Sequence, residues 1–122
     1  GMAVILITHD LGVIAEYAKD VVVMYAGRVV ERAPVKEIFA APKHPYTKGL
    51  LGSIPVPKRG EERKRLPTIE GVVPDLRDLP PGCRFADRCA MVIDACREAE
   101  PALEEVSPGH FARCIRSAEV SP

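Results

Sequence analysis

Three things are missing from this sequence of 122 residues: an excess of charge, a long apolar run and an internal repeat. Basic and acidic residues number 17 each, which argues against binding to nucleic acid or membrane surfaces through bulk charge. No apolar run approaches the ~18 residues that a membrane-spanning helix needs. The short apolar run at 3–7 has no basic lead-in, so we expect no secretory signal and a cytoplasmic setting, where thiols stay reduced.

The first part of the chain predicts the end of an α/β sheet. Residues 3–7 (AVILI) form a continuous apolar run, which is typical of a strand buried on both faces of a parallel sheet. A helix is expected from Leu11, with Thr8 or Asp10 as its cap. Two further strands, 21–25 and 29–31, complete a β-α-β-β order.

Glycine and proline set the boundaries of the next elements. Gly27 can take the positive φ that a turn between the last two strands requires. Prolines open two short helices, at 34–40 and from Pro45 to about Ser53. The predicted fold class is therefore an α/β fragment with short helices, followed by a small irregular cysteine-rich unit.

Three parts are predicted along the chain. Residues 1–57 form the α/β part, 58–65 form a charged linker and 66–122 form the cysteine-rich unit. The linker holds five basic and two acidic residues, and we interpret it as solvated, with phosphate contact as the minor alternative. The last unit contains only 15 Val, Ile, Leu, Phe and Met residues, too few to offset chain entropy without a covalent or metal staple.

Four cysteines with the spacing C-x5-C-x6-C-x17-C could supply that staple: Cys83, Cys89, Cys96 and Cys114. Structural zinc favours pairs two to four residues apart, and disulfides conflict with a reducing compartment, so both are secondary alternatives. An iron–sulfur cluster tolerates wider spacing, because each thiolate can bind a different iron. Four arginines flank the cysteines and could offset the charge of such a cluster: Arg84, Arg88, Arg97 and Arg113.

Two histidines are candidates for chemistry. His9 follows the first predicted strand, at the edge where α/β sheets bind ligands, and could donate a hydrogen bond to a phosphate oxygen. The alternative is that His9 helps to cap the helix at Leu11. His110 precedes Cys114 by four residues and could be a metal ligand, although a surface histidine in a loop is the simpler interpretation.

Residues 4–31 (VILITHDLGVIAEYAKDVVVMYAGRVVE) resemble the switch-histidine region of ATP-binding-cassette (ABC) transporter ATPases. The stretch APKHPYTKGLLGSIP (41–55), the run GCRF and the late Cys114 are similar to the C-terminal extension of ATPase subunits of oligopeptide, dipeptide and nickel permeases. The resemblance covers essentially the whole chain. It implies that His9 contacts the γ-phosphate of ATP and that the four cysteines hold a [4Fe–4S] cluster, with zinc as the second choice. The HPYT motif (His44–Thr47) is expected to be structural, with the Tyr46 ring buried.

Several motifs of those ATPases are absent from the sequence. There is no Walker A loop (G-x4-G-K-[S/T]), no apolar strand ending in Asp-Glu and no LSGGQ-like signature. The chain thus resembles the C-terminal segment of a longer ATPase and should not hydrolyse ATP alone. The resemblance implies ATP and Mg²⁺ for the full-length protein. It also implies permease partners, a second ATPase subunit, an external binding protein and a place on the inner face of the cell membrane.

Two other interpretations remain open. A stand-alone metal-binding or redox module would explain the missing Walker A loop, but the strand at 3–7 needs neighbours that such a module lacks. We therefore expect the isolated chain to self-associate. Binding of nucleic acid by residues 58–65 is disfavoured by the zero net charge and by the acidic residues expected in C-terminal helices, namely Asp94, Glu98, Glu100, Glu104 and Glu105.

Overall fold

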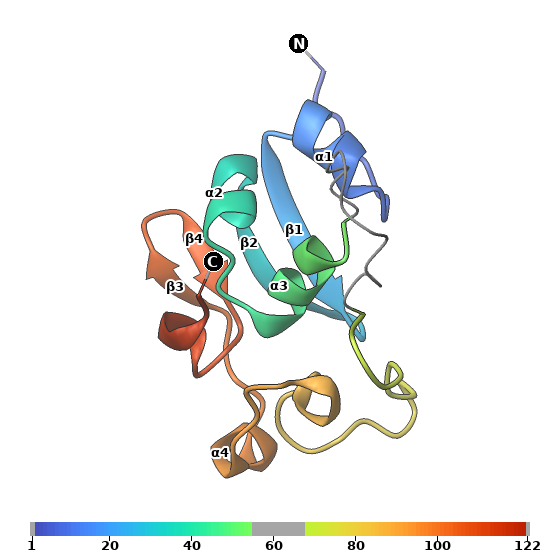
Figure 1. Ribbon diagram of the computed structural model, residues 1–122, viewed down its shortest axis with the longest axis vertical. Coiled ribbons are helices and arrows are strands. Elements are labelled where there is room, and N and C mark those ends of the chain that lie inside the picture. The colour runs from blue at the N-terminus through green and yellow to red at the C-terminus, as the bar shows by residue number, and fades with distance from the viewer. Residues whose placement is uncertain (1, 55–67, 122) are drawn as a thin grey trace, which may run out of the picture.

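A four-stranded antiparallel sheet forms the centre of the computed structural model, which describes residues 2–54 and 68–121 (Figure 1). Strands β1 (Asp20–Tyr25) and β2 (Arg28–Pro34) form a hairpin. β4 (His110–Ala112) pairs with β2, and β3 (Glu104–Ser107) pairs with β4. One sheet therefore contains strands from both sides of the predicted linker at 58–65, which itself lies outside the described residues.

The hairpin confirms the predicted pair of strands and its turn. Ala26 and Gly27 have φ values of 46° and 78°, the left-handed pair that a two-residue hairpin loop requires. β1 turns Val21 and Tyr25 into the interior, whereas Val22 is 52% exposed. The strand is thus apolar on both faces but buried on only one.

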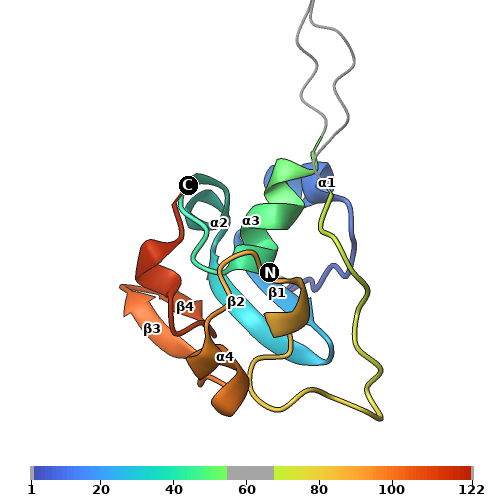
Figure 2. The same ribbon diagram turned by 60° about the horizontal axis from the view of Figure 1, so that its bottom comes forward.

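Three of the predicted helices are confirmed. Helix α1 (Leu11–Tyr17) begins after Asp10, whose carboxylate accepts the backbone N–H groups of Gly12 and Val13 at 3.0 and 3.2 Å. Helices α2 (Val35–Ala40) and α3 (Pro45–Gly52) lie where the prolines place them. Figure 2 shows α1, α2 and α3 together on one side of the hairpin.

The predicted strand at 3–7 is wrong, and with it the β-α-β-β order and the parallel sheet. These residues form no strand, and their side chains are exposed, Ile5 by 90% and Ile7 by 93%. A strand that is apolar on both faces needs a neighbouring strand to pair with and a layer on each face. No strand in the described part of the chain pairs with residues 3–7.

The prediction of acidic helices near the C-terminus is correct for one segment and wrong for the next. Asp94 and Glu98 bound helix α4, but Glu104 and Glu105 lie in strand β3. Two short 3₁₀ turns, η1 (Ala86–Arg88) and η2 (Ser117–Glu119), complete the elements. Across residues 2–54 and 68–121, none of the helices combines the length and apolar character needed to traverse a bilayer.

Two apolar cores hold the molecule together. The first lies between α1, α2 and the hairpin around Val21, Ala33 and Ile38. The second forms around Tyr25, Val30 and Phe85, with the Tyr25 and Phe85 rings edge to face at 5.2 Å. The second core holds the cysteine-bearing segment against the hairpin. Figure 1 shows that α1 and α4 lie at opposite ends of the long axis of the molecule.

Candidate functional site

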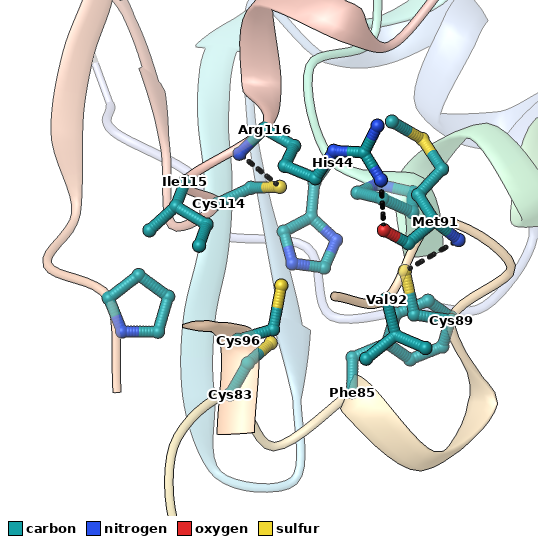
Figure 3. A pocket seen from close by; sticks show the side chains of 12 residues that line it. His44, Cys83, Phe85, Cys89, Met91, Val92, Cys96, Cys114, Ile115 and Arg116 are labelled. Carbon is teal, nitrogen blue, oxygen red and sulfur yellow. Dashed lines mark hydrogen bonds between the residues drawn. The ribbon is translucent and has the colours of Figure 1, made fainter. Parts of the chain in front are cut away.

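All four cysteines line one pocket, which encloses about 370 Å³ including the space open to solvent (Figure 3). Cys83 and Cys89 flank η1, Cys96 lies in α4 and Cys114 follows β4. The fold thus brings together thiols that are up to 31 positions apart in the sequence. Eight further residues complete the lining: His44, Pro45, Phe85, Met91, Val92, Pro101, Ile115 and Arg116.

A close backbone contact brings Cys83 beside Cys96. The Cys83 N–H donates to the Cys96 carbonyl at 2.7 Å. Gly82, which has a φ of +81°, allows this approach, since a Cβ there would lie 2.4 Å from the Cys96 oxygen. The 3₁₀ turn η1 then brings the chain back to the pocket at Cys89, whose N–H donates to the Ala86 carbonyl at 3.3 Å. The spacing C-x5-C therefore reflects one tight turn rather than a zinc knuckle.

Gly82→Ala should destabilise the fold more than Gly109→Ala. Both glycines have a positive φ, so each substitution costs about 1–2 kcal/mol of backbone strain. Nothing lies within 4 Å of a Cβ at Gly109, whereas at Gly82 it would strike the Cys96 backbone. Urea unfolding should show the larger loss for Gly82→Ala, together with faster reaction of the thiols with a disulfide reagent. Equal losses in the two variants would contradict this account of the close approach.

The four sulfur atoms are free thiols in a half-buried setting, so the disulfide alternative is not supported. Backbone N–H groups donate to two of them, from Met91 to Cys89 Sγ at 3.3 Å and from Arg116 to Cys114 Sγ at 3.4 Å. Burial raises the pKa of Cys89, and it raises that of Cys114 to about 11, although these N–H donors lower both values. The three other cysteines add to the rise in the pKa of Cys114.

In the described part of the chain, the four thiols are not arranged as the ligands of a metal ion. Within residues 2–54 and 68–121, no group of three His, Cys, Asp or Glu side chains could hold a single ion. A structural zinc ion needs four ligand atoms at about 2.0–2.3 Å from one point.

His44 forms part of the pocket wall and is 1% exposed (Figure 3). It is the N-cap of α3: its Nδ1 accepts the Tyr46 N–H at 3.0 Å. The ring also makes a backbone hydrogen bond with Arg113, the residue before Cys114. The imidazole is therefore engaged with two backbone segments, and the expected structural role of the HPYT motif agrees with this geometry.

Stability should fall as pH decreases from 6.5 to 4, because burial lowers the pKa of His44 to about 4. The unfolded chain takes up the proton near pH 6.5, whereas the folded chain resists it. The stabilisation from the neutral ring is thus complete above pH 6.5, and its loss at pH 4 amounts to about 3 kcal/mol. His44→Asn keeps an N-cap acceptor and should remove this slope from urea unfolding midpoints. A slope unchanged in His44→Asn would refute the assignment.

A buried acid beside this wall was not foreseen from the sequence. Glu31 is fully buried in β2 and accepts the N–H groups of Lys43 and His44 at 2.7 and 2.9 Å. The Glu31 carboxyl group also contacts the ring of His110, with 2.5 Å between Oε2 and Nε2. The interpretation of His110 as a surface histidine is wrong: it is 1% exposed, because β4 carries it against β2. An acid in a strand next to valines gives no sequence signal of such a role.

His9 is not part of this site. It is exposed, lies just before α1 and does not line the cysteine pocket. Asp10, and not His9, caps the helix, so the capping alternative for His9 is wrong. No hydrogen bond or ion pair engages the His9 ring within the part of the chain that the structure describes.

Comparison with known proteins gives consistent matches. Residues 30–96 match the profile of a family described as oligopeptide/dipeptide transporter, C-terminal region. A probable peptide ABC transporter ATP-binding protein of Sinorhizobium fredii is 56% identical over 120 residues, which is 98% of this chain and 36% of the relative. The oligopeptide transport ATP-binding protein OppD of Mycobacterium tuberculosis is 50% identical over 99% of this chain and 20% of its own length. The chain thus spans about a third or less of these relatives.

Proposed function

Since the chain belongs to the oligopeptide/dipeptide transporter C-terminal region family, we propose that it is the C-terminal segment of an ATP-hydrolysing subunit that powers peptide import through an ABC permease. One observation carries this proposal: proteins named as peptide ABC transporter or peptide import ATP-binding proteins match 98–99% of the chain at 52–56% identity. Nothing in these matches favours a stand-alone metal-binding or redox module.

In this proposal the subunit binds ATP and Mg²⁺ with residues that precede this segment, and His9 supplies a hydrogen-bond donor to the γ-phosphate. The His9 ring is exposed and makes no hydrogen bond within the described residues, which supports that role. A ring N–H that already donates within the fold would not be free to donate to a ligand. The segment alone does not hydrolyse ATP. Permease subunits and a second ATPase subunit hold the assembly on the inner face of the cell membrane.

A chimera tests this function. The matching 121 residues of M. tuberculosis OppD are replaced by this chain, and ATP hydrolysis and peptide uptake are measured with that transporter's own partners. The chimera should restore both activities to a relative truncated before the segment. A folded chimera as inactive as the truncated protein would refute the proposal.

The cysteine pocket is the second part of the proposed function. Cys83, Cys89, Cys96 and Cys114 hold a [4Fe–4S] cluster, with zinc as the second choice. The donor set supports this proposal: four thiols line one pocket, and backbone N–H groups donate to two of the sulfurs. Held by these four cysteines, such a cluster would supply a structural cross-link, because Cys114 follows β4 whereas the other three cysteines lie around η1 and in α4.

Metal content of anaerobically purified protein tests the pocket. A broad absorption at roughly 400 nm with about four irons and four sulfides per chain is expected. Cys114→Ser should abolish both signals, whereas Ile115→Val, a change in the same pocket wall that removes no ligand, should keep them. One zinc ion per chain and no colour would refute the cluster and support the zinc alternative. A protein without iron or zinc would refute both.

The exposed segment 2–7 supports the earlier expectation that the isolated chain self-associates. Met2, Ile5 and Ile7 are each at least 90% exposed, which is unfavourable for apolar side chains in water. In the proposed longer subunit, a preceding part of the chain covers them. Light scattering that shows a stable monomer of this chain at micromolar concentration would count against self-association.

A further inference from the structure

Three of the four arginines next to the cysteines reach the same end of the β1–β2 hairpin. Arg84 Nη1 donates to the Ala26 carbonyl at 2.5 Å in the hairpin turn. Arg113 Nε donates to the Val29 carbonyl at 2.8 Å, and Arg88 Nη1 donates to the Tyr25 hydroxyl at 3.3 Å. Each arginine is the immediate sequence neighbour of Cys83, Cys114 or Cys89, in that order.

Arg113 bonds the hairpin through both its side chain and its backbone. Its side chain also donates to the Pro101 carbonyl at 3.0 Å, and its backbone N–H donates to the Val30 carbonyl at 2.7 Å. A guanidinium fixes two acceptors in one plane, which the ammonium of lysine cannot do. The position of Cys114 is thus determined by β2 on one side and by the segment before β3 on the other.

Arg97 makes no such contact, although it is the neighbour of Cys96. Its guanidinium pairs with Asp87 at 2.5 Å on the surface, and its side chain is 48% exposed, against 17% for Arg84. If the arginines served only to offset the charge of the thiolates, all four would be equivalent. The structure divides them into three that bond the hairpin and one that does not.

We propose that Arg84, Arg88 and Arg113 are positioning residues that fasten three of the four cysteines to the β1–β2 hairpin, so that filling the cysteine pocket and ordering the hairpin end are coupled. The inference rests on the proposed cluster. Coupling of this kind is reciprocal: an occupant that fixes the cysteines slows opening of the hairpin end, and loosening the hairpin end weakens the hold on the occupant. Residues that orient metal ligands commonly have such effects.

The test compares Arg113→Lys and Arg84→Lys with the matched control Arg97→Lys in the full, anaerobically purified chain. All three variants keep the positive charge. Transfer of iron to a coloured chelator should become roughly tenfold faster in Arg113→Lys and Arg84→Lys and stay close to wild type in Arg97→Lys. Hydrogen exchange at residues 25–31 should slow on iron loading in wild type and lose that response in Arg113→Lys.

The outcomes separate the two proposals. The positioning role is overturned, while the cluster stands, if all three variants lose iron at the same rate. It is also overturned if hydrogen exchange at residues 25–31 of the wild-type protein does not change on iron loading. A wild-type chain that binds no iron overturns the cluster and this inference together. If Arg113→Lys fails to fold, which circular dichroism of the stripped protein would show, Arg84→Lys decides by the same two measurements.

Discussion

Replacing Glu31 with alanine should lower the free energy of unfolding by about 3–5 kcal/mol. The carboxylate is fully buried and has three partners, the Lys43 and His44 N–H groups and the His110 ring. Alanine would leave all three without an acceptor in a site that water does not reach. Since domains of this size are stable by only about 5–15 kcal/mol, the variant should be close to unfolding at ordinary temperature.

Urea unfolding measures this effect, and two comparisons make it specific. Glu104→Ala removes an exposed carboxylate from β3 and should change stability by less than about 0.5 kcal/mol. A double-mutant cycle with Glu31→Gln and His110→Gln should give a coupling energy of about 1 kcal/mol or more. Independent, additive effects of the two changes would show that the pair does not act as a unit.

The position of Glu31 explains why its effect should extend to the cysteine pocket. Glu31 lies opposite Ala112 in the sheet and reaches the start of α3. His44 and the backbone before Cys114 both form or adjoin the pocket wall. A change at one strand position of the hairpin would therefore loosen two separate walls of the pocket, although Glu31 is not among the residues that line it.

Local signals predicted the hairpin and helices well. A Gly27 turn, the Asp10 cap and the prolines before α2 and at the start of α3 each act over a few residues, so the sequence suffices to locate them. Whether residues 3–7 form a strand could not be decided from the local sequence. An apolar run becomes a strand only when neighbours pair with it, and none of the described strands does so.

The sequence predicted the cysteines of the candidate site but not the buried residues that hold its walls in place. Four cysteines in a segment poor in large apolar residues predict one cluster of thiols, and the fold brings them together. The acid–histidine pair of Glu31 and His110 joins residues 79 positions apart, through the pairing of β2 with β4. β3 contains two glutamates and β4 ends in alanine, residues with weak strand propensity, so the sequence did not predict that pairing.

Replacing His9 with alanine in the complete ATP-binding subunit should lower kcat for ATP hydrolysis by roughly 10²-fold or more. The proposed donor to the γ-phosphate acts most strongly when charge builds up on the phosphate oxygens in the transition state, so KM for ATP should change far less than kcat. Steady-state hydrolysis measured over a range of ATP concentrations separates the two constants.

The control for this prediction is Asp10→Ala, which tests whether His9 matters only as part of the start of α1. That change removes the acceptor for two N–H groups and should weaken the helix by about 1 kcal/mol while leaving the imidazole in place. If positioning of α1 were the whole role of this segment, Asp10→Ala would reduce hydrolysis as much as His9→Ala. Hydrolysis that survives in His9→Ala but fails in Asp10→Ala would reject the phosphate contact, whereas the reverse result would mean that this exposed imidazole acts directly on the nucleotide.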